Sequence, residues 1–169
     1  MEVETAIRTR RTHKAFGSEP LPREQIEELL ELARWAPNHH LTAPWRFRVV
    51  GPRTLERLKD AAGPEGAAKL ERAPTLIVAS CPVTADDPVQ SEEDLHATAV
   101  ASYIVLLAAH ARGLAGYWRT PGLLRAGAGR AALGLPPEER SVGLLHLGHP
   151  RQERPVPERP AAATVTFLD

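Results

Sequence analysis

Basic side chains gather near the N-terminus in a pattern suited to binding chemistry. Arg8, Arg10, Arg11 and Lys14 lie close together, with a hydroxyl at Thr12 and no acidic residue among them. Arginine and lysine donate charge-assisted hydrogen bonds to phosphates and carboxylates, so this cluster is suited to an anionic ligand. Taken alone, the same run is more typical of a solvated basic surface, because most charge runs are solvated.

Several widespread reaction centres have no counterpart in the sequence. The adjacent pair His39-His40 is accompanied by no HExxH motif and no cysteine pair, so the sequence predicts no metal site. There is no Gly-x-Ser-x-Gly elbow, no Walker A loop and no Gly-x-Gly-x-x-Gly dinucleotide motif. Cys81, the single cysteine, ends an apolar segment and is expected to pack rather than react. A hydrolase that uses a side-chain nucleophile is therefore disfavoured.

Hydrophobic periodicity predicts alternating helices and strands that would position these side chains. Helices are expected over Glu2–Arg10, Pro22–Ala36, Thr54–Ala62, Gly66–Arg72, Asp94–Arg112 and Arg125–Leu133. Strands are expected over Trp45–Val50, Thr75–Ser80, Gly116–Thr120 and Val142–Gly148. Thr54 is expected to cap its helix, and Ser91 or Asp94 to cap the longest one.

The longest predicted helix, Asp94–Arg112, is apolar almost all the way round its axis. Val100, Val105 and Leu106 widen its main apolar stripe. A helix of this kind must be buried on several sides, and in so short a chain a subunit interface is a natural place for one of them.

The last part of the chain is expected to form an extended arm. Four prolines between His149 and Pro160 favour a polyproline-like conformation over the surface. The alternating segment Ala163–Leu168 then has the pattern of a strand. A strand at the end of a long arm is suited to pairing with a partner subunit.

Four motifs follow one another along almost the whole chain. They are Arg10-Arg-Thr-His-Lys-Ala-Phe16, Ala36-Pro-Asn-His39 with Pro44-Trp-Arg-Phe47, Gly116-Tyr-Trp-Arg-Thr120 after the long helix, and Val142-Gly-Leu-Leu-His-Leu-Gly-His-Pro150. In this order and at these separations they resemble the nitroreductase family of flavin-dependent oxidoreductases. The details Ala-Pro-Asn-His and Trp-Arg-Thr are similar to small family members related to the bacterial protein YdjA.

The resemblance implies a fold, an assembly and a cofactor. A member of this family would be one α+β domain over residues 1–169, a three-layer α/β/α sandwich around a mostly antiparallel sheet. It would be a homodimer with FMN bound at the subunit interface. Residues 149–169, the arm and its strand, could then be exchanged between the subunits.

The resemblance also implies which residues would bind the cofactor. Arg10 and Arg11 would hold the FMN phosphate together with the Thr12 hydroxyl, and Arg159 on the arm is a further candidate. Lys14 would lie near N1 and O2 of the ring, where a cation stabilises the reduced, anionic flavin. The remaining candidates lie beside the ring or ribityl chain, either in a loop from the other subunit or in a strand: Pro37, Asn38 and His39, and Trp118, Arg119 and Thr120.

In such an enzyme the flavin carries the chemistry and no side chain is expected to be catalytic. NADH or NADPH would deliver hydride, and a nitroaromatic, a quinone or a similar small-molecule acceptor would bind next, in ping-pong order. Three alternatives stay open. They are an FMN-binding protein for storage or delivery, a family member with a dehalogenating or flavin-fragmenting reaction, and an unrelated α+β binding domain with a basic patch.

Composition places the chain among ordinary globular proteins. Hydrophobic residues make up 43% and charged residues 25% of the sequence. The 21 basic and 21 acidic residues balance, so nucleic acid and anionic membranes are not expected as partners. Met1–Thr5 lacks the order of a signal peptide, and the apolar run Ala99–Ala109 is shorter than a membrane span. A cytoplasmic protein is expected.

Overall fold

The computed structural model describes residues 1–156, 158–160 and 164–168, and it is built around one antiparallel sheet. Its strands, in the spatial order β1-β2-β4-β3, are β1 (Arg46–Val49), β2 (Thr75–Pro82), β4 (Glu139–Gly148) and β3 (Ala115–Arg119). The central pair runs from Thr75 opposite Leu147 to Pro82 opposite Glu139, with one register shift after Ala79. β3 is therefore an edge strand.

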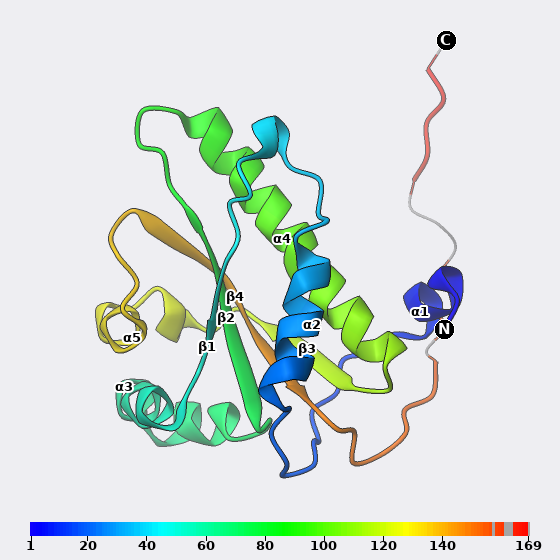
Figure 1. The fold of residues 1–169 in the computed structure, drawn as a ribbon, viewed down its shortest axis with the longest axis horizontal. Coiled ribbons are helices and arrows are strands. Elements are labelled where there is room, and N and C mark those ends of the chain that lie inside the picture. Colours follow the sequence, from blue (N-terminus) through cyan, green and yellow to red (C-terminus); the bar gives the residue numbers. More distant parts are fainter. Residues whose placement is uncertain (157, 161–163, 169) are drawn as a thin grey trace.

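Helices cover both faces of the sheet (Figure 1). One face packs against α2 (Arg23–Ala33) and α4 (Pro88–Ala111), and the other against α3 (Pro52–Leu70) and α5 (Gly127–Leu133). The remaining short elements are α1 (Val3–Thr9) beside α4, η1 (His39–Leu41) and η2 (Gly122–Leu124). The predicted three-layer α+β fold is confirmed.

Alternation along β4 creates the two cores, because successive side chains of a strand point to opposite faces. Leu145 and Leu147 pack with the α2 and α4 side chains, including Val105. Leu144 packs with Leu58 of α3 and with residues of α5. α4 is long and apolar enough to cross a membrane, but it packs against α2 and three strands, which makes it a core helix.

Two helix starts differ from the sequence prediction. α3 begins at Pro52 with Gly51 as its N-cap, so Thr54 is not the cap. α4 begins at Pro88, and the Asp87 side chain caps it by accepting a hydrogen bond from the Gln90 N–H at 2.9 Å. In both cases a proline occupies the first turn, where its missing N–H costs nothing. The sequence predicts a break between the helices 54–62 and 66–72, and the structure has a kink within α3 at Gly63, where φ is +67°.

The chain end forms no strand in residues 164–168, so the predicted strand Ala163–Leu168 is wrong for the isolated chain; Ala163 itself lies outside the described residues. Phe167 and Leu168 are each 91% exposed. A strand needs a neighbour for its backbone hydrogen bonds, and Figure 1 shows the tail leading away from the sheet. The described arm residues 151–156 and 158–160 belong to no helix or strand, and Arg151 donates its backbone N–H to the Ala15 carbonyl.

Candidate functional site

The N-terminal motif lies along the outer edge of the sheet. After α1 the chain is extended, and Thr12 forms a parallel bridge with Gly116 of β3. His13 donates its backbone N–H to the Gly116 carbonyl at 3.1 Å, and Phe16 bridges to Pro150. These contacts fix the place of residues 10–16 relative to β3 and to the start of the arm.

Arginines from both ends of the chain meet beside α1. Arg10 and Arg159 line an open groove of about 680 Å³ together with Tyr103. The Arg10 guanidinium lies 5.7 Å from the centre of the Tyr103 ring, and its buried Nε has no hydrogen-bond partner in the described part of the chain. Burial, followed by the charges of Arg159 and Arg10, lowers the pKa of Arg11.

The positive charge of this cluster is not neutralised by an ion pair within the described part of the chain. Among the described residues, no carboxylate pairs with Arg10, Arg11 or Arg159. The pKa of His13 is lowered by burial and then by nearby Arg154 and Arg10, so the positive field extends along the motif. An anionic group placed here would relieve repulsion between like charges.

Arg11 differs from its neighbour because its guanidinium is occupied by backbone carbonyls. It is 8% exposed and donates to Arg8 O at 3.0 Å, to Arg10 O, and to Pro155 O at 3.4 Å. Arg11 thus closes the end of α1 and ties the arm to it.

Lys14 faces a separate basic hollow of about 830 Å³, which Arg72 and Arg151 also line. The one acidic residue in its lining, Glu71, pairs with Lys59 at 2.6 Å. The three remaining cations therefore have no carboxylate partner among the residues that the structure describes.

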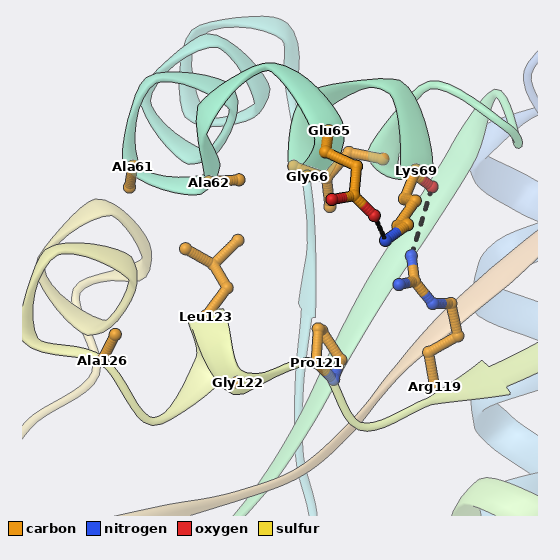
Figure 2. A pocket seen from close by; sticks show the side chains of 11 residues that line it. Ala61, Ala62, Glu65, Gly66, Lys69, Arg119, Pro121, Gly122, Leu123 and Ala126 are labelled. Carbon is orange, nitrogen blue, oxygen red and sulfur yellow. Dashed lines mark hydrogen bonds and ion pairs between the residues drawn. The ribbon is translucent and has the colours of Figure 1, made fainter.

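Trp118 and Arg119 of β3 point to opposite sides of the sheet. The Trp118 indole lies over Gly143 and donates to the Val142 carbonyl at 3.4 Å, so this side chain belongs to the packing. Arg119 lines a pocket of about 440 Å³ between α3 and η2, where it donates to the Lys69 carbonyl at 3.3 Å (Figure 2). Thr120 follows directly and is exposed.

The loop that contains Pro37, Asn38 and His39 is built around its own side chains. The Asn38 amide accepts from the Ala43 N–H at 2.9 Å and donates to Ala36 O at 3.2 Å, so it closes the loop rather than facing outward. His39 Nδ1 lies 2.7 Å from Glu93 Oε2 near the start of α4.

The two predicted halves of the site lie at opposite ends of α4 (Figure 1). His39 contacts Glu93 at one end, and Thr9 lies within 2.8 Å of His110 at the other. The Arg10 guanidinium itself lies against Tyr103 of α4, and at 1.5 Å per residue the helix between Glu93 and Tyr103 spans about 15 Å. One chain therefore does not bring His39 to the Arg10 cluster.

Comparison with known proteins identifies the family of this chain. A family model described as "Nitroreductase family" matches residues 7–67 and 64–149. The chain belongs to the nitroreductase family. All four motifs identified in the sequence lie within the matched range or at its edge.

Individual relatives match this nitroreductase-family chain over most of its length. It is 27% identical to YfhC of Bacillus subtilis, covering 90% of this chain and 87% of that one. It is 31% identical to YdjA of Escherichia coli, covering 79% and 81%. Both names mark candidate NAD(P)H nitroreductases. A solved nitroreductase-like structure from Desulfovibrio desulfuricans, in complex with FMN, is 27% identical with a TM-score of 0.81 and covers 99% of each chain.

The sequence motifs of this nitroreductase-family protein do not identify several polar residues that lie at or near the site. His13 lies inside the first motif, and its buried Nδ1 has no partner among the described residues. Alternation along an extended segment places His13 on the same side as buried Arg11, so the sequence pattern does indicate that His13 faces inward. Lys69 lies on α3 and Arg72 in the turn after it, between the motifs, and no sequence signal distinguishes them from ordinary surface cations.

Proposed function

We propose that this protein is an FMN-dependent oxidoreductase that uses NADH or NADPH to reduce a nitroaromatic, a quinone or a similar acceptor in the cytoplasm. Its family membership and its likeness to an FMN-bound structure support the proposal. The observation that carries it is the arginine cluster around Arg10, which no carboxylate balances in the described part of the chain. FMN, when bound, would supply the redox chemistry: it would take hydride from NADH or NADPH and then reduce the acceptor, in ping-pong order.

The residues beside α1 fit a flavin phosphate. A phosphate dianion requires several donors, and arginine matches its geometry with a planar fork. Arg10 and Arg159 line one groove, and the unpartnered Arg10 Nε is available to an acceptor. The Thr12 hydroxyl is exposed nearby, and Arg11 adds charge while its own donors hold the backbone. Arg10 and Arg159 are thus the principal phosphate ligands of this proposal.

The cations farther along the motif are suited to the rest of the cofactor. Lys14, Arg72 and Arg151 surround one hollow, and Arg119 lines the next one along α3. A cation beside the pyrimidine edge of a flavin favours its reduced, anionic form. Lys14 is assigned this role, whereas Trp118 acts by packing against the sheet and Thr120 by its position after β3.

A homodimer is part of the proposal, because it would bring together what one chain holds apart. Apolar side chains from α1, α2 and α4 surround an open hollow of about 320 Å³, and Trp35 at its edge is 76% exposed. Val3 is 68% exposed on the same face. A second copy on this face would bury these side chains. It would also bring Pro37, Asn38 and His39 to the partner's cofactor.

The visible spectrum of the purified protein, before and after anaerobic addition of NADH or NADPH, tests the function. A flavin band that bleaches supports the proposal and identifies the donor. A band that persists would favour an FMN storage or delivery protein. If no flavin binds even after reconstitution with FMN, the proposal is wrong.

Replacing Arg10 tests the phosphate assignment. We expect R10A to weaken FMN binding at least tenfold, because a charge-assisted hydrogen bond contributes about 1.5–3 kcal/mol. FMN titration monitored by flavin fluorescence measures the change, and circular dichroism confirms that the variant folds. R23A is the matched control, since Arg23 pairs with Glu27 on the exposed face of α2. Equal affinities for R10A and R23A would contradict the assignment.

A further inference from the structure

We infer that Thr42 and Asp94 are positioning residues: their hydrogen bond holds the strained loop 38–43 in the shape that presents His39 to the cofactor site of a second subunit. The inference rests on the proposed function, because only the FMN-binding homodimer gives this loop a ligand. The bond itself, the burial of Asp94 and the strain that the bond opposes are features of the single chain.

The loop backbone adopts conformations that its residues disfavour. His40, Leu41 and Ala43 have φ values of +51°, +52° and +45°. This left-handed region suits glycine, and side chains with a Cβ atom enter it at a cost. Three such residues so close together relax unless the surrounding structure holds them, and strain of this kind concentrates at functional sites.

Asp94 provides the most sheltered anchor. It is 4% exposed on α4, and its Oδ1 accepts from the Thr42 hydroxyl at 2.9 Å and from the Gln90 side-chain amide at 2.9 Å. No cation pairs with it among the described residues. A buried carboxylate is costly unless it is hydrogen-bonded, so its contacts with Thr42 and Gln90 are strongly favoured. α4 is a rigid core helix and fixes the position of the acceptor.

Further contacts orient the exposed part of the loop. The His39 ring lies 2.7 Å from Glu93, the residue before Asp94, and stacks on His40 with ring centres 3.8 Å apart. The His39 side chain is nevertheless 55% exposed, and Leu41 is 85% exposed. An apolar tip and an oriented imidazole on the surface are suited to contact with another subunit. Thr42 connects this exposed tip to the buried carboxylate.

Two substitutions at Thr42 distinguish the contribution of its hydroxyl group from that of its side-chain shape. T42V removes the donor and keeps the branched side chain, whereas T42S keeps the donor. Hydrogen exchange of the free protein, followed at the Thr42 and Ala43 amides, reports on the loop without any cofactor. These amides donate to His39 O and to Asn38 Oδ1. We expect T42V to accelerate their exchange at least tenfold and T42S to keep it close to wild type.

FMN titration of the same variants tests the presentation of His39. We expect T42V and D94A to weaken FMN binding at least fivefold, and T42S and D94N to retain the wild-type affinity, because asparagine keeps an acceptor oxygen. S91A is the matched control. Ser91, on the first turn of α4, bonds through its hydroxyl to the backbone of Thr84, in another loop. S91A is expected to leave both the exchange of loop 38–43 and FMN affinity unchanged.

The possible failures are distinguishable. If wild-type protein binds no FMN, the proposed function is wrong, while hydrogen exchange still tests the anchor. If T42V exchanges as slowly as wild type, Thr42 does not hold the loop and the inference is overturned. If T42V loosens the loop but binds FMN as wild type does, the loop does not serve the cofactor site. That result also overturns the inference.

Discussion

Arg10 and Arg11 are adjacent in the chain but have different surroundings. Arg10 lies in the groove with an unpartnered Nε, whereas Arg11 is buried and donates to carbonyls at the end of α1. Helix C-termini leave carbonyls without partners, and a nearby cation satisfies them. One arginine is therefore available for a ligand, while its neighbour mainly stabilises the backbone that positions it.

His146 is the polar residue with the least favourable surroundings. It is fully buried on β4, its ring centre lies 5.6 Å from that of Tyr117, and neither nitrogen has a hydrogen-bond partner in the described part of the chain. Burial, followed by the charges of Arg119 and Arg72, lowers its pKa to about 3. The folded protein thus keeps this imidazole neutral at pH values where the unfolded chain takes up a proton.

Acid should therefore destabilise the protein through His146. Below about pH 6.5 the unfolded state binds the proton first, so the free energy of unfolding falls by about 1.4 kcal/mol per pH unit until the folded pKa is reached. We expect H146L to lack this contribution and to be at least as stable as wild type at pH 7.5, since it leaves no buried nitrogen unpaired. Urea unfolding at pH 7.5, 6.0 and 4.5 measures the difference. H96Q, at an exposed position of α4, should keep the wild-type dependence of unfolding free energy on pH. If H146L showed that same dependence on pH, the prediction would be wrong.

The strands are joined by side chains as well as by backbone. Arg48 of β1 donates to Glu139 of β4 at 2.8 and 3.0 Å, and Ser80 of β2 donates to the same carboxylate at 2.8 Å. These bonds lie next to the register shift that follows Ala79, where the backbone pattern of β2 and β4 is interrupted. The bonds from Arg48 and Ser80 outweigh burial, so the pKa of Glu139 is lowered.

Replacing Glu139 should weaken the sheet in a pH-dependent way. We expect E139Q to lose about 2 kcal/mol of unfolding free energy at pH 7, because a partly buried, charge-assisted pair is broken. Since the folded pKa is depressed, wild type loses this stabilisation as pH falls below about 4, and the two proteins should converge. Urea unfolding at pH 7 and pH 3 tests both points. E27Q, which breaks an exposed pair on α2, should show no measurable change, and an E139Q variant as stable as E27Q would contradict the prediction.

At the scale of the whole molecule, one open hollow is lined almost entirely by apolar side chains. Trp35 follows the end of α2, the side chains around it belong mainly to α1, α2 and α4, and the tail leaves Phe167 and Leu168 almost fully exposed. A contiguous apolar surface on a soluble protein commonly marks an interface. The dimer proposed above would cover it, and would give the tail a neighbour with which to pair.

A charge on this apolar face should oppose the proposed dimer. We expect W35E to raise the dimer dissociation constant at least tenfold, because an unpaired carboxylate would be buried in the interface. Light scattering across a dilution series measures the mass, and FMN affinity should fall in parallel. V49E is the control, since Val49 is half exposed on β1, the opposite edge strand of the sheet. If W35E remains a dimer at the dilution where wild type does, this face is not the interface.

Prediction from sequence succeeded where local patterns carried the information. The predictions of a strand at Thr75–Ser80 and of a loop between Pro37 and Pro44 are confirmed, because periodicity and proline positions act within a few residues. α4 starts at Pro88 rather than near Asp94, because the Asp87 side chain caps the helix and Pro88 occupies its first turn. The strand Ala163–Leu168 was wrong for the single chain, because alternation shows a preference for pairing but does not provide the partner.

The sequence by itself determined most of the helices and strands, the family to which the chain belongs, and the presence of a basic cluster near the N-terminus. Those properties are encoded in short motifs and in their order. Only the tertiary structure decided that Arg11 faces backbone carbonyls and that Asn38 closes its own loop. It also decided that His39 and Arg10 contact α4 at separate places, Glu93 and Tyr103, about 15 Å apart along the helix. Contacts of this kind join residues far apart in the chain, and they follow from packing two helices on each face of one sheet.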